Sequence, residues 1–342
     1  MTIAITPFTG SPVEWDRFAR GCEGFSHFHL HGWKGVVERT FGHECLYLAA
    51  RHEAGRLAGV LPLVRVKSLL FGHYLVSMPF LNYGGPLGEA EAVQALAASA
   101  ADRARSDGAK LLELRSRVPL PTDLPVSHRK ITVVLDLLAT TDEVWKRLPS
   151  KLRSQIRKPE KEGVTFEIGP DQLEPFYAVF SRHMRDLGTP TLPRVFFQEV
   201  ARTFPDDARF GCAWYRGKPV ACGAGFRFGR EFEMTWASSL SEYNRIAPNL
   251  GLYWAFMQRA VTEGASEFNF GRCSPGSGTH RFKLQWGSRD VPLYWYQQSR
   301  SGGEAATPSP DQGAYSMGPK VWKRLPLPLA NLLGPRIVRG IP

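Results

Sequence analysis

Positively charged side chains gather in one short segment, SKLRSQIRK, at residues 150 to 158. Ser150 is a suitable N-cap, and Arg153 and Arg157, four positions apart, would share one helix face close to Lys151. Two guanidinium groups on one face can hold a phosphate through paired hydrogen bonds. The segment therefore predicts a phosphate-binding face, and a solvated basic helix is the alternative interpretation.

The second candidate phosphate site is the start of a helix expected at residues 250 to 263. It opens with Arg245-Ile-Ala-Pro248-Asn249-Leu-Gly251, where free backbone N–H groups and the helix dipole could hold a phosphate. Only one glycine is present in this segment. An ordinary helix that begins at a proline is therefore the alternative.

Three other patterns are weaker. His27, His29 and His31 alternate as on one strand face, but no Cys or carboxylate set completes a metal site, so we expect none. Cys273 and His280 could form a thiol–histidine pair for covalent catalysis, an interpretation we do not favour. The stretch CSPGSGTH between them has neither a Walker pattern nor a nucleophile elbow and indicates a flexible loop.

Composition limits the class of protein. The chain has 342 residues, 43% hydrophobic and 12% aromatic content, and a net charge of +11, which favours polyanionic partners. The five cysteines are scattered and odd in number, which fits a reducing compartment. The chain starts without a secretory signal pattern and contains no long uncharged apolar run. We expect a cytoplasmic protein.

Two distant stretches show the same order of local signals. Residues 45–66 and 209–228 each consist of two apolar runs around a turn, Ala54-Gly55 and Gly217-Lys218, as in a β-hairpin. Each is followed by another β-rich segment, then a helix at about residues 91–107 or 250–263. Each helix ends at a glycine and leads to a short strand. The chain therefore contains a duplicated unit.

A hairpin, a third strand and a helix crossing to a parallel strand is the element order of the acetyltransferase (GNAT) core. A duplicated α+β domain of unrelated function is the alternative, because it would show a similar pattern. We therefore predict an α/β (α+β) fold of two tandem GNAT-like domains, each a mixed sheet flanked by helices. The predicted ranges are 1–138 and 139–300, followed by a linker at 301–319 and a basic, apolar tail at 320–342.

Longer motifs carry a resemblance to a family. In the first half they are Phe28-His29 with Trp33, GVLPL (59–63), KSLLFG (67–72) and SMPFLNYGGP (77–86). In the second they are Trp145 with SKLRSQIRK, MRDLGTP (184–190) and FNFGRCSPGSGTHRFKLQWG (268–287). The chain resembles the FemAB-like peptidyltransferases of the GNAT superfamily, especially the branch associated with exosortase (PEP-CTERM) and exopolysaccharide systems.

The resemblance implies direct transfer of an acyl or aminoacyl group to an amine, without a covalent intermediate or a tightly bound cofactor. The co-substrate would be acyl-CoA or aminoacyl-tRNA, and the acceptor a peptidoglycan, exopolysaccharide or other envelope precursor, either a small molecule or a glycan. The matching Phe-Lys pair of relatives makes Phe282 and Lys283 catalytic candidates, with Lys283 stabilising the oxyanion. A Lys on an exposed strand face is the alternative.

The proton acceptor stays open. Asn269 stands where relatives often have Asp, and Asn cannot act as a base, so it would orient the substrate. Glu231, Glu233 and Tyr253 remain candidates, and Tyr253 also belongs with Arg245, Asn249 and Gly251 to the predicted donor site. The predicted acceptor site comprises Lys151, Arg153, Arg157, Arg182, His183, Arg185, Arg272 and Arg281.

The tail combines apolar residues with basic ones and contains no acid. It could lie at an anionic inner-membrane surface or pack against the domains, and its four prolines exclude one long helix. Two further interpretations compete with the enzyme: a non-catalytic GNAT-fold protein that binds an anionic glycan precursor or RNA, and a nucleic-acid regulator, which has charge but no motif. The oligomeric state stays open.

Overall fold

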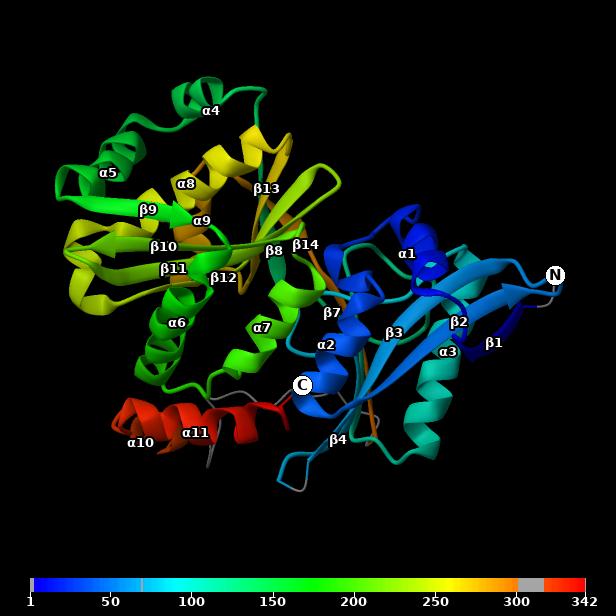
Figure 1. Cartoon of the computed structure of the whole chain (residues 1–342). Coiled ribbons are helices and arrows are strands. Elements are labelled where there is room, and N and C mark those ends of the chain that lie inside the picture. Colours follow the sequence, from blue (N-terminus) through cyan, green and yellow to red (C-terminus); the bar gives the residue numbers. More distant parts are fainter. Residues whose placement is uncertain (1–2, 69, 301–316, 342) are drawn as a thin grey trace. The chain divides into compact units, whose positions relative to one another are not determined.

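The computed structural model describes residues 3–68, 70–300 and 317–341, and these divide into two compact units (Figure 1). The first unit comprises the chain up to Lys130, a strand near residue 296 and the residues from Arg336. The second contains the rest. Most of the predicted linker, residues 301–316, lies outside the described residues.

The first unit holds one sheet with the strand order β1-β2-β3-β4-β6-β15-β7, and β5 pairs with β3. Its helices are α1 (Pro12–Arg20), α2 (Gly32–Phe41) and α3 (Ala90–Ser106), with a 3-10 turn, η1 (His27–His29). Its strands are β1 (Ile3–Pro7), β2 (Glu44–His52), β3 (Leu57–Ser68), β4 (Gly72–Ser77), β5 (Leu87–Gly88), β6 (Leu111–Ser116), β7 (Val126–Ser127) and β15 (Tyr294–Ser299).

The second unit repeats this arrangement, with the strand order β14-β8-β13-β12-β11-β10-β9. Its strands are β8 (Ile131–Asp136), β9 (Val164–Ile168), β10 (Ala208–Tyr215), β11 (Lys218–Phe228), β12 (Glu231–Ser239), β13 (Glu267–Cys273) and β14 (Arg289–Pro292). Its helices are α4 (Thr141–Arg147), α5 (Ser150–Lys161), η2 (Pro170–Gln172), α6 (Leu173–Leu187), α7 (Arg194–Thr203), η3 (Ser241–Ile246), α8 (Pro248–Thr262), α9 (Gly278–Leu284) and α10 (Met317–Trp322). Helix α11 (Leu327–Val338) runs from this unit into the last residues of the first.

The predicted duplication is confirmed in detail. The helices α3 and α8 each follow an antiparallel hairpin and a third strand, and each leads to a parallel partner, β6 or β13. Both end in the same cap, because Gly108 and Gly264 adopt positive φ and the following amides bond back to Ala104 and Ala260. The fold is thus α/β with two tandem GNAT-like units.

The units do not end where the sequence predicts. Residues 131–136 form β8, which pairs with β13 of the second sheet, although they were assigned to the first domain. Conversely, β15 pairs with β6 of the first sheet. The two halves of the chain thus exchange one strand each. Hydrophobic patterning finds a strand but carries no information on which sheet it joins.

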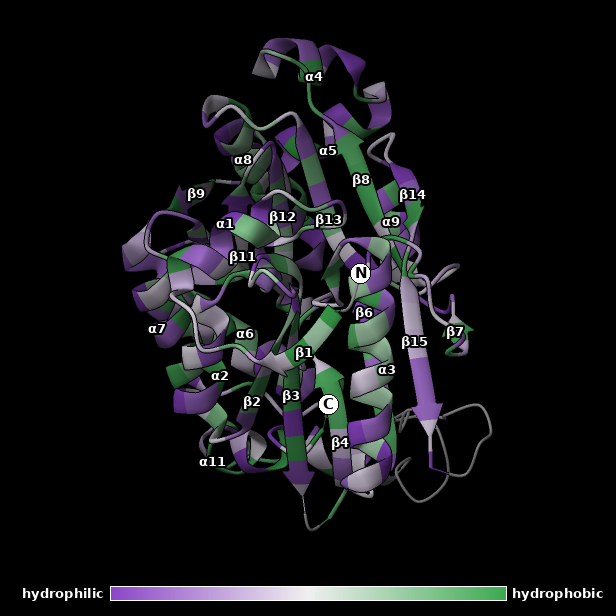
Figure 2. Ribbon diagram, turned by 90° about the vertical axis from the view of Figure 1, so that its right-hand side faces the viewer, coloured by the Kyte–Doolittle hydropathy of each residue, from purple (hydrophilic) through white to green (hydrophobic). Residues whose placement is uncertain are grey.

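The residue types on the facing surfaces determine how the helices pack on each sheet. In the second unit, Gly211 and Gly223 face each other on β10 and β11, and a Cβ on either would lie 2.9 Å from the ring of Phe256. These glycines let α8 approach one face of the sheet, whereas α6 packs against the other (Figure 1). In the first unit, hydrophobic and hydrophilic residues alternate along α3, whose alanines and leucines face β2 and β3 (Figure 2).

Two local predictions need correction. The second hairpin turns at Arg216-Gly217, one residue earlier than predicted, because both central residues of this tight turn have positive φ and Lys218 already pairs with Tyr215. The N-cap of α5 is Pro149, so Ser150 is the first helical residue and makes no capping hydrogen bond.

Candidate active site

The two parallel strands at the centre of the second sheet, β12 and β13, separate and leave a cavity between the surrounding elements. Strands β12 and β13 pair only from Glu231 to Glu233, opposite Glu267 to Asn269, although β12 continues to Ser239. Beyond that point lies a cavity of about 360 Å³, bordered by β11, β12, the end of α6 and the starts of α8 and α9. The described lining residues are His183, Cys222, Met234, Ala237, Ser238, Ser239, Ser241, Asn244, Asn249, Leu252, Tyr253, Gly278, Thr279 and Phe282.

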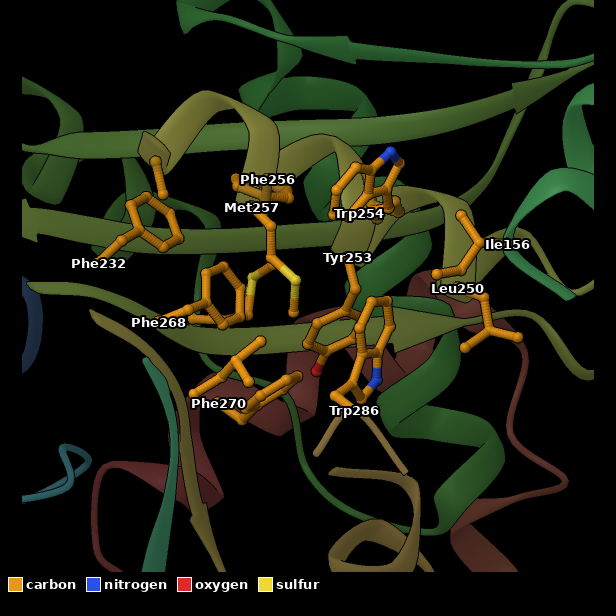
Figure 3. Close-up of a cluster of buried hydrophobic side chains, with 14 of the residues drawn as sticks. Ile156, Phe232, Leu250, Tyr253, Trp254, Phe256, Met257, Phe268, Phe270 and Trp286 are labelled. Atoms are coloured by element: carbon orange, nitrogen blue, oxygen red, sulfur yellow. The ribbon is translucent and has the colours of Figure 1, made fainter. Parts of the chain in front are cut away.

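Four predicted site residues meet at this cavity: His183, Asn249, Tyr253 and Phe282. Tyr253 extends from α8 into an aromatic cluster, where its ring stacks on Phe270 (Figure 3). Its ring also meets that of Phe282 edge-on at a centroid distance of 5.1 Å. Burial raises the pKa of the Tyr253 phenol, so this side chain is neutral and can donate a proton at pH 7.

Lys283 lies on helix α9 and is buried, so the alternative of a Lys on an exposed strand face is wrong. Its Nζ donates to the carbonyl oxygens of Gly271, at 2.6 Å, and Arg272, at 3.1 Å. Burial lowers the pKa of Lys283 to about 8, and nearby Cys273 and Glu233 oppose this shift. The lining residues include its neighbour Phe282 and not Lys283 itself.

Asn269 on β13 and Glu231 and Glu233 on β12 are buried within the second sheet. Asn269 is fully buried, its Nδ2 donates to Glu231 Oε1 at 2.7 Å, and its Oδ1 accepts from the Thr132 hydroxyl and from the Gly271 amide. These bonds tie β8, β12 and β13 together at a bulge of β13. Glu233, also fully buried, does not line the cavity. The network therefore has a structural role in this geometry.

The start of α8 borders the cavity through Asn249. Ala247, in the left-handed conformation, precedes Pro248, and no side chain caps the helix. The amide of Leu250 donates to the Ala247 carbonyl. Arg245 is exposed on η3 beside it. Gly251 also has a packing role, because a Cβ there would lie 2.1 Å from the ring of Phe166. Its missing side chain lets β9 pack against α8.

The predicted basic face of residues 150–158 forms on α5, but it does not border the cavity described above. Ser150, Arg153, Ser154, Arg157 and Lys161 line a separate groove along α5, while Leu152 and Ile156 are buried on its inner side. The Arg157 guanidinium lies 5.0 Å from the centre of the Trp145 ring. Lys151 is exposed on the same helix and is not among the described groove residues.

The remaining predicted acceptor residues are dispersed. Arg182 pairs with Glu242 at 2.7 Å, and Arg185 pairs with Asp186 and donates to the carbonyl of Leu325. Arg281 is exposed and donates to the carbonyl of Gly276. Arg272 is half-buried on β13. The structure therefore brings His183 alone of this group to the cavity.

The histidines singled out in the sequence have structural partners. His27 and His29 lie in the turn η1 rather than on a strand, and His29 bonds to Ser26 and to the carbonyl of Gly85. His280 accepts from the Gly276 amide and bonds to Asp290, so it does not serve as a base for Cys273. Ser277 caps α9, which holds the glycine-rich loop in place. No cluster of metal-ligating side chains occurs in the described parts of the chain.

In the first unit, the corresponding space beside β6 holds the chain's own backbone. Strand β4 stops at Ser77, and the loop 78–86 folds back so that the amides of Gly84 and Gly85 donate to the Arg115 carbonyl. Arg115 in turn donates to the Leu81 carbonyl and pairs with Glu113 at 2.7 Å. The loop is buried and fills this space beside β6.

Several lining residues belong to no motif that sequence reasoning could have found. Ser238 and Ser239 at the end of β12, Asn244 on η3 and Thr279 on α9 are small polar residues in segments of ordinary composition. Only the separation of β12 from β13 makes them neighbours. The hydrophobic pattern of a strand does not reveal where its hydrogen bonding to a parallel neighbour ends.

Comparisons with known proteins agree with this architecture. Residues 146–284 match the acetyltransferase (GNAT) domain family. A stretch of 124 residues is 27% identical to UDP-N-acetylmuramoylpentapeptide-lysine N(6)-alanyltransferase of Weissella viridescens. The match covers 35% of this chain and 37% of that protein, so it spans little more than a third of the relative.

Solved structures extend the similarity over both units. The crystal structure of FemX superposes with a TM-score of 0.64 at 15% identity and covers 88% of this chain and 98% of that one. The C-terminal domain of a putative lysylphosphatidylglycerol synthetase from Agrobacterium fabrum gives 0.55 at 14% identity, covering 85% and 92%. A tandem GNAT protein from the clavulanic acid biosynthesis pathway gives 0.54 at 12% identity, covering 89% and 100%. These findings support the resemblance to the FemAB-like acyltransferases of the GNAT superfamily.

Proposed function

We propose that the second unit catalyses direct transfer of an activated acyl or aminoacyl group to an amine, which forms an amide bond. The observation that carries this proposal is the cavity where β12 and β13 separate, with Tyr253 and Phe282 in its wall. The cavity opens beside the uncapped start of α8, where negative groups of a donor would be favoured.

The chemistry needs position and charge rather than a metal or nucleophile. An amine nitrogen attacks the acyl carbon, and the electron pair of the carbonyl moves to its oxygen. The buried ammonium of Lys283, adjacent in the chain to the lining residue Phe282, would stabilise that oxygen electrostatically in a low-dielectric site. Tyr253 would protonate the departing sulfur or oxygen.

The donor is acyl-CoA or aminoacyl-tRNA. Arg245 and Asn249, at the start of α8, would contact its phosphates, whereas Gly251 contributes through packing. The acceptor is an amine of a peptidoglycan, exopolysaccharide or other envelope precursor, by analogy with the alanyltransferase, and we place the chain in the exosortase-associated branch. The groove with Arg153 and Arg157 would hold phosphates of tRNA or of a nucleotide-linked acceptor.

The test is transfer itself. Purified protein is incubated with acetyl-CoA, a longer acyl-CoA or alanyl-tRNA, together with UDP-N-acetylmuramoyl pentapeptide, and the amide product is measured by mass spectrometry. Titration calorimetry with each donor, repeated on Arg245→Ala, identifies the one that binds. Product formation with at least one donor is expected, and its absence with all of them contradicts the proposal.

A non-catalytic binding protein is the second candidate, and the observation that favours it is Asn269. This side chain is bonded into the sheet and cannot act as a base. Tight binding of a phosphorylated glycan precursor or RNA without turnover would favour this alternative. Any turnover abolished by Lys283→Met would exclude it.

We also propose that the tail contacts an anionic membrane surface. It forms two short helices, α10 and α11, with Val321, Leu329 and Leu332 exposed at 60%, 40% and 56%. Its exposed basic residues are Lys320, Lys323, Arg324, Arg336 and Arg339, and no acid occurs between residues 317 and 342. Exposed apolar side chains among bases suit anionic lipid. None of the helices in the described residues could span a bilayer.

The inner face of the tail is anchored to its own surroundings, so single exposed residues are better probes than a deletion. Ala330 and Gly334 are buried, and Asn331 Nδ2 bonds to Ser181. Replacing Val321, Leu329 and Leu332 together by Ser should abolish sedimentation with vesicles of phosphatidylglycerol and phosphatidylcholine. Val13→Ser, at an equally exposed site, is the control. Undiminished sedimentation of the triple variant rules the membrane role out.

A further inference from the structure

His183 reaches the cavity from the side opposite α8. It lies in the C-terminal half of α6, which packs against β11 and β12, and it lines the cavity together with Ser238 and Ser239. Tyr253 and Asn249 line the same cavity from α8. A substrate placed there would have the imidazole on one side and the phenol on the other.

The surroundings of His183 keep its ring neutral. The backbone of Ser239, which also lines the cavity, favours the protonated ring. A neutral imidazole keeps one nitrogen lone pair that can accept a proton. Burial lowers the pKa of His183, and the carboxylate of Asp186 on the same helix opposes this shift. Arg182, its neighbour, is paired with Glu242.

The other titratable groups that line the cavity cannot accept a proton near pH 7. Burial raises the pKa of Cys222 on β11 and of Tyr253 on α8, so both are protonated and act only as donors. Of the predicted bases, Glu231 receives the Asn269 amide, and Glu233 does not line the cavity. Among the described lining residues, His183 alone offers a basic nitrogen at neutral pH.

We propose that His183 is the general base of the transfer. As the C–N bond forms, the amine nitrogen becomes positively charged, and the lone pair of His183 takes one of its protons. The oxyanion then collapses, the bond from carbon to sulfur or oxygen breaks, and the leaving group takes a proton from the tyrosine or from the imidazolium. The amide and the thiol or hydroxyl products balance the step. This inference rests on the proposed function.

His183→Gln tests the inference, because glutamine keeps a polar side chain of similar length but its amide cannot accept the proton. We expect kcat to fall at least about a hundredfold, with donor affinity by calorimetry unchanged. His183→Ala should recover part of its turnover with added imidazole, and the kcat of the wild type should decline as pH falls through the pKa of His183. His128→Gln, in the first unit, is the matched control.

The outcomes are separable. Turnover of His183→Gln within threefold of the wild type, about 0.7 kcal/mol by the rate relation, overturns the role of His183 while the transferase function stands. Loss of donor binding in this variant, or no response of His183→Ala to imidazole, also overturns it. Absence of turnover in the wild type with every donor refutes the proposed function, and this inference with it.

Discussion

The buried ammonium group of Lys283 should make the stability of the protein depend on alkaline pH. The side chain is only 2% exposed, and burial lowers its pKa from the ordinary 10.5 to about 8. The difference between the two values corresponds to about 3 kcal/mol, because one pKa unit is about 1.4 kcal/mol. This free energy is the cost of keeping the charged form inside the folded protein.

The sign follows from proton binding. Between pH 10.5 and 8 the unfolded chain binds a proton at Lys283 and the folded protein does not, so the free energy of unfolding falls as pH falls through this range. Below pH 8 both states are protonated and no further change occurs. Raising the pH from about 7.5 to 10 should therefore stabilise the folded state by about 2 to 3 kcal/mol at this site.

Other lysines and tyrosines titrate in the same range, so the measurement is a difference. Urea unfolding of the wild type and of Lys283→Met is followed by tryptophan fluorescence at several pH values. Trp286, in the core beside Tyr253, reports on this unit (Figure 3). The stability of the wild type relative to the variant should rise by about 2 to 3 kcal/mol from pH 7.5 to 10. A difference that stays constant within about 0.5 kcal/mol refutes the burial of a charged Lys283.

Three further predictions concern residues with assigned structural roles. Gly251→Ala should destabilise the second unit by about 1–3 kcal/mol in urea unfolding, because Phe166 must move, while calorimetric donor affinity is kept. Burial lowers the pKa of His29 to about 4, so the free energy of unfolding should fall by up to about 3 kcal/mol as pH falls from 6.5 to 4. His29→Gln should remove this pH dependence from acid-unfolding curves. Asn269→Asp should not raise kcat and should lower stability by about 1–3 kcal/mol, because it places a carboxylate against Glu231; a gain in turnover would make this position catalytic.

Local chemistry let the sequence predict the repeated elements. The glycines after α3 and α8 stop both helices with the same backbone bonds, and Gly217 marks the second hairpin, although its turn lies one residue earlier than predicted. These features depend on neighbours in the chain, so they are legible in the sequence. The strand exchange of β8 and β15 depends on pairing between segments far apart, and no local pattern encodes it.

The site was predictable in part for the same reason. The motif resemblance located Phe282 and Lys283, but it could not show that Lys283 is buried on a helix with its Nζ bonded to two carbonyls. His183 was predicted as one of eight acceptor residues, and only the packing of α6 against β12 separates it from the others. Ser238 and Ser239 carry no signal at all, since their role arises from where β12 leaves β13.

Buried backbone with positive φ occurs in the loop 78–86 of the first unit. In the first unit, Met78 and Phe80 adopt positive φ, which costs about 1–3 kcal/mol for each residue without a compensating fit. The loop is held by the Gly85 amide bonded to the Arg115 carbonyl and by the carbonyl of Gly85 bonded to His29. Such strain persists only where the surroundings fix the backbone, so the loop 78–86 is a stable part of the fold. In the second unit, the segment that follows β12 lines the cavity through Ser241 and Asn244. Under the proposed function, this cavity is where a carbonyl, an amine and the imidazole of His183 would meet.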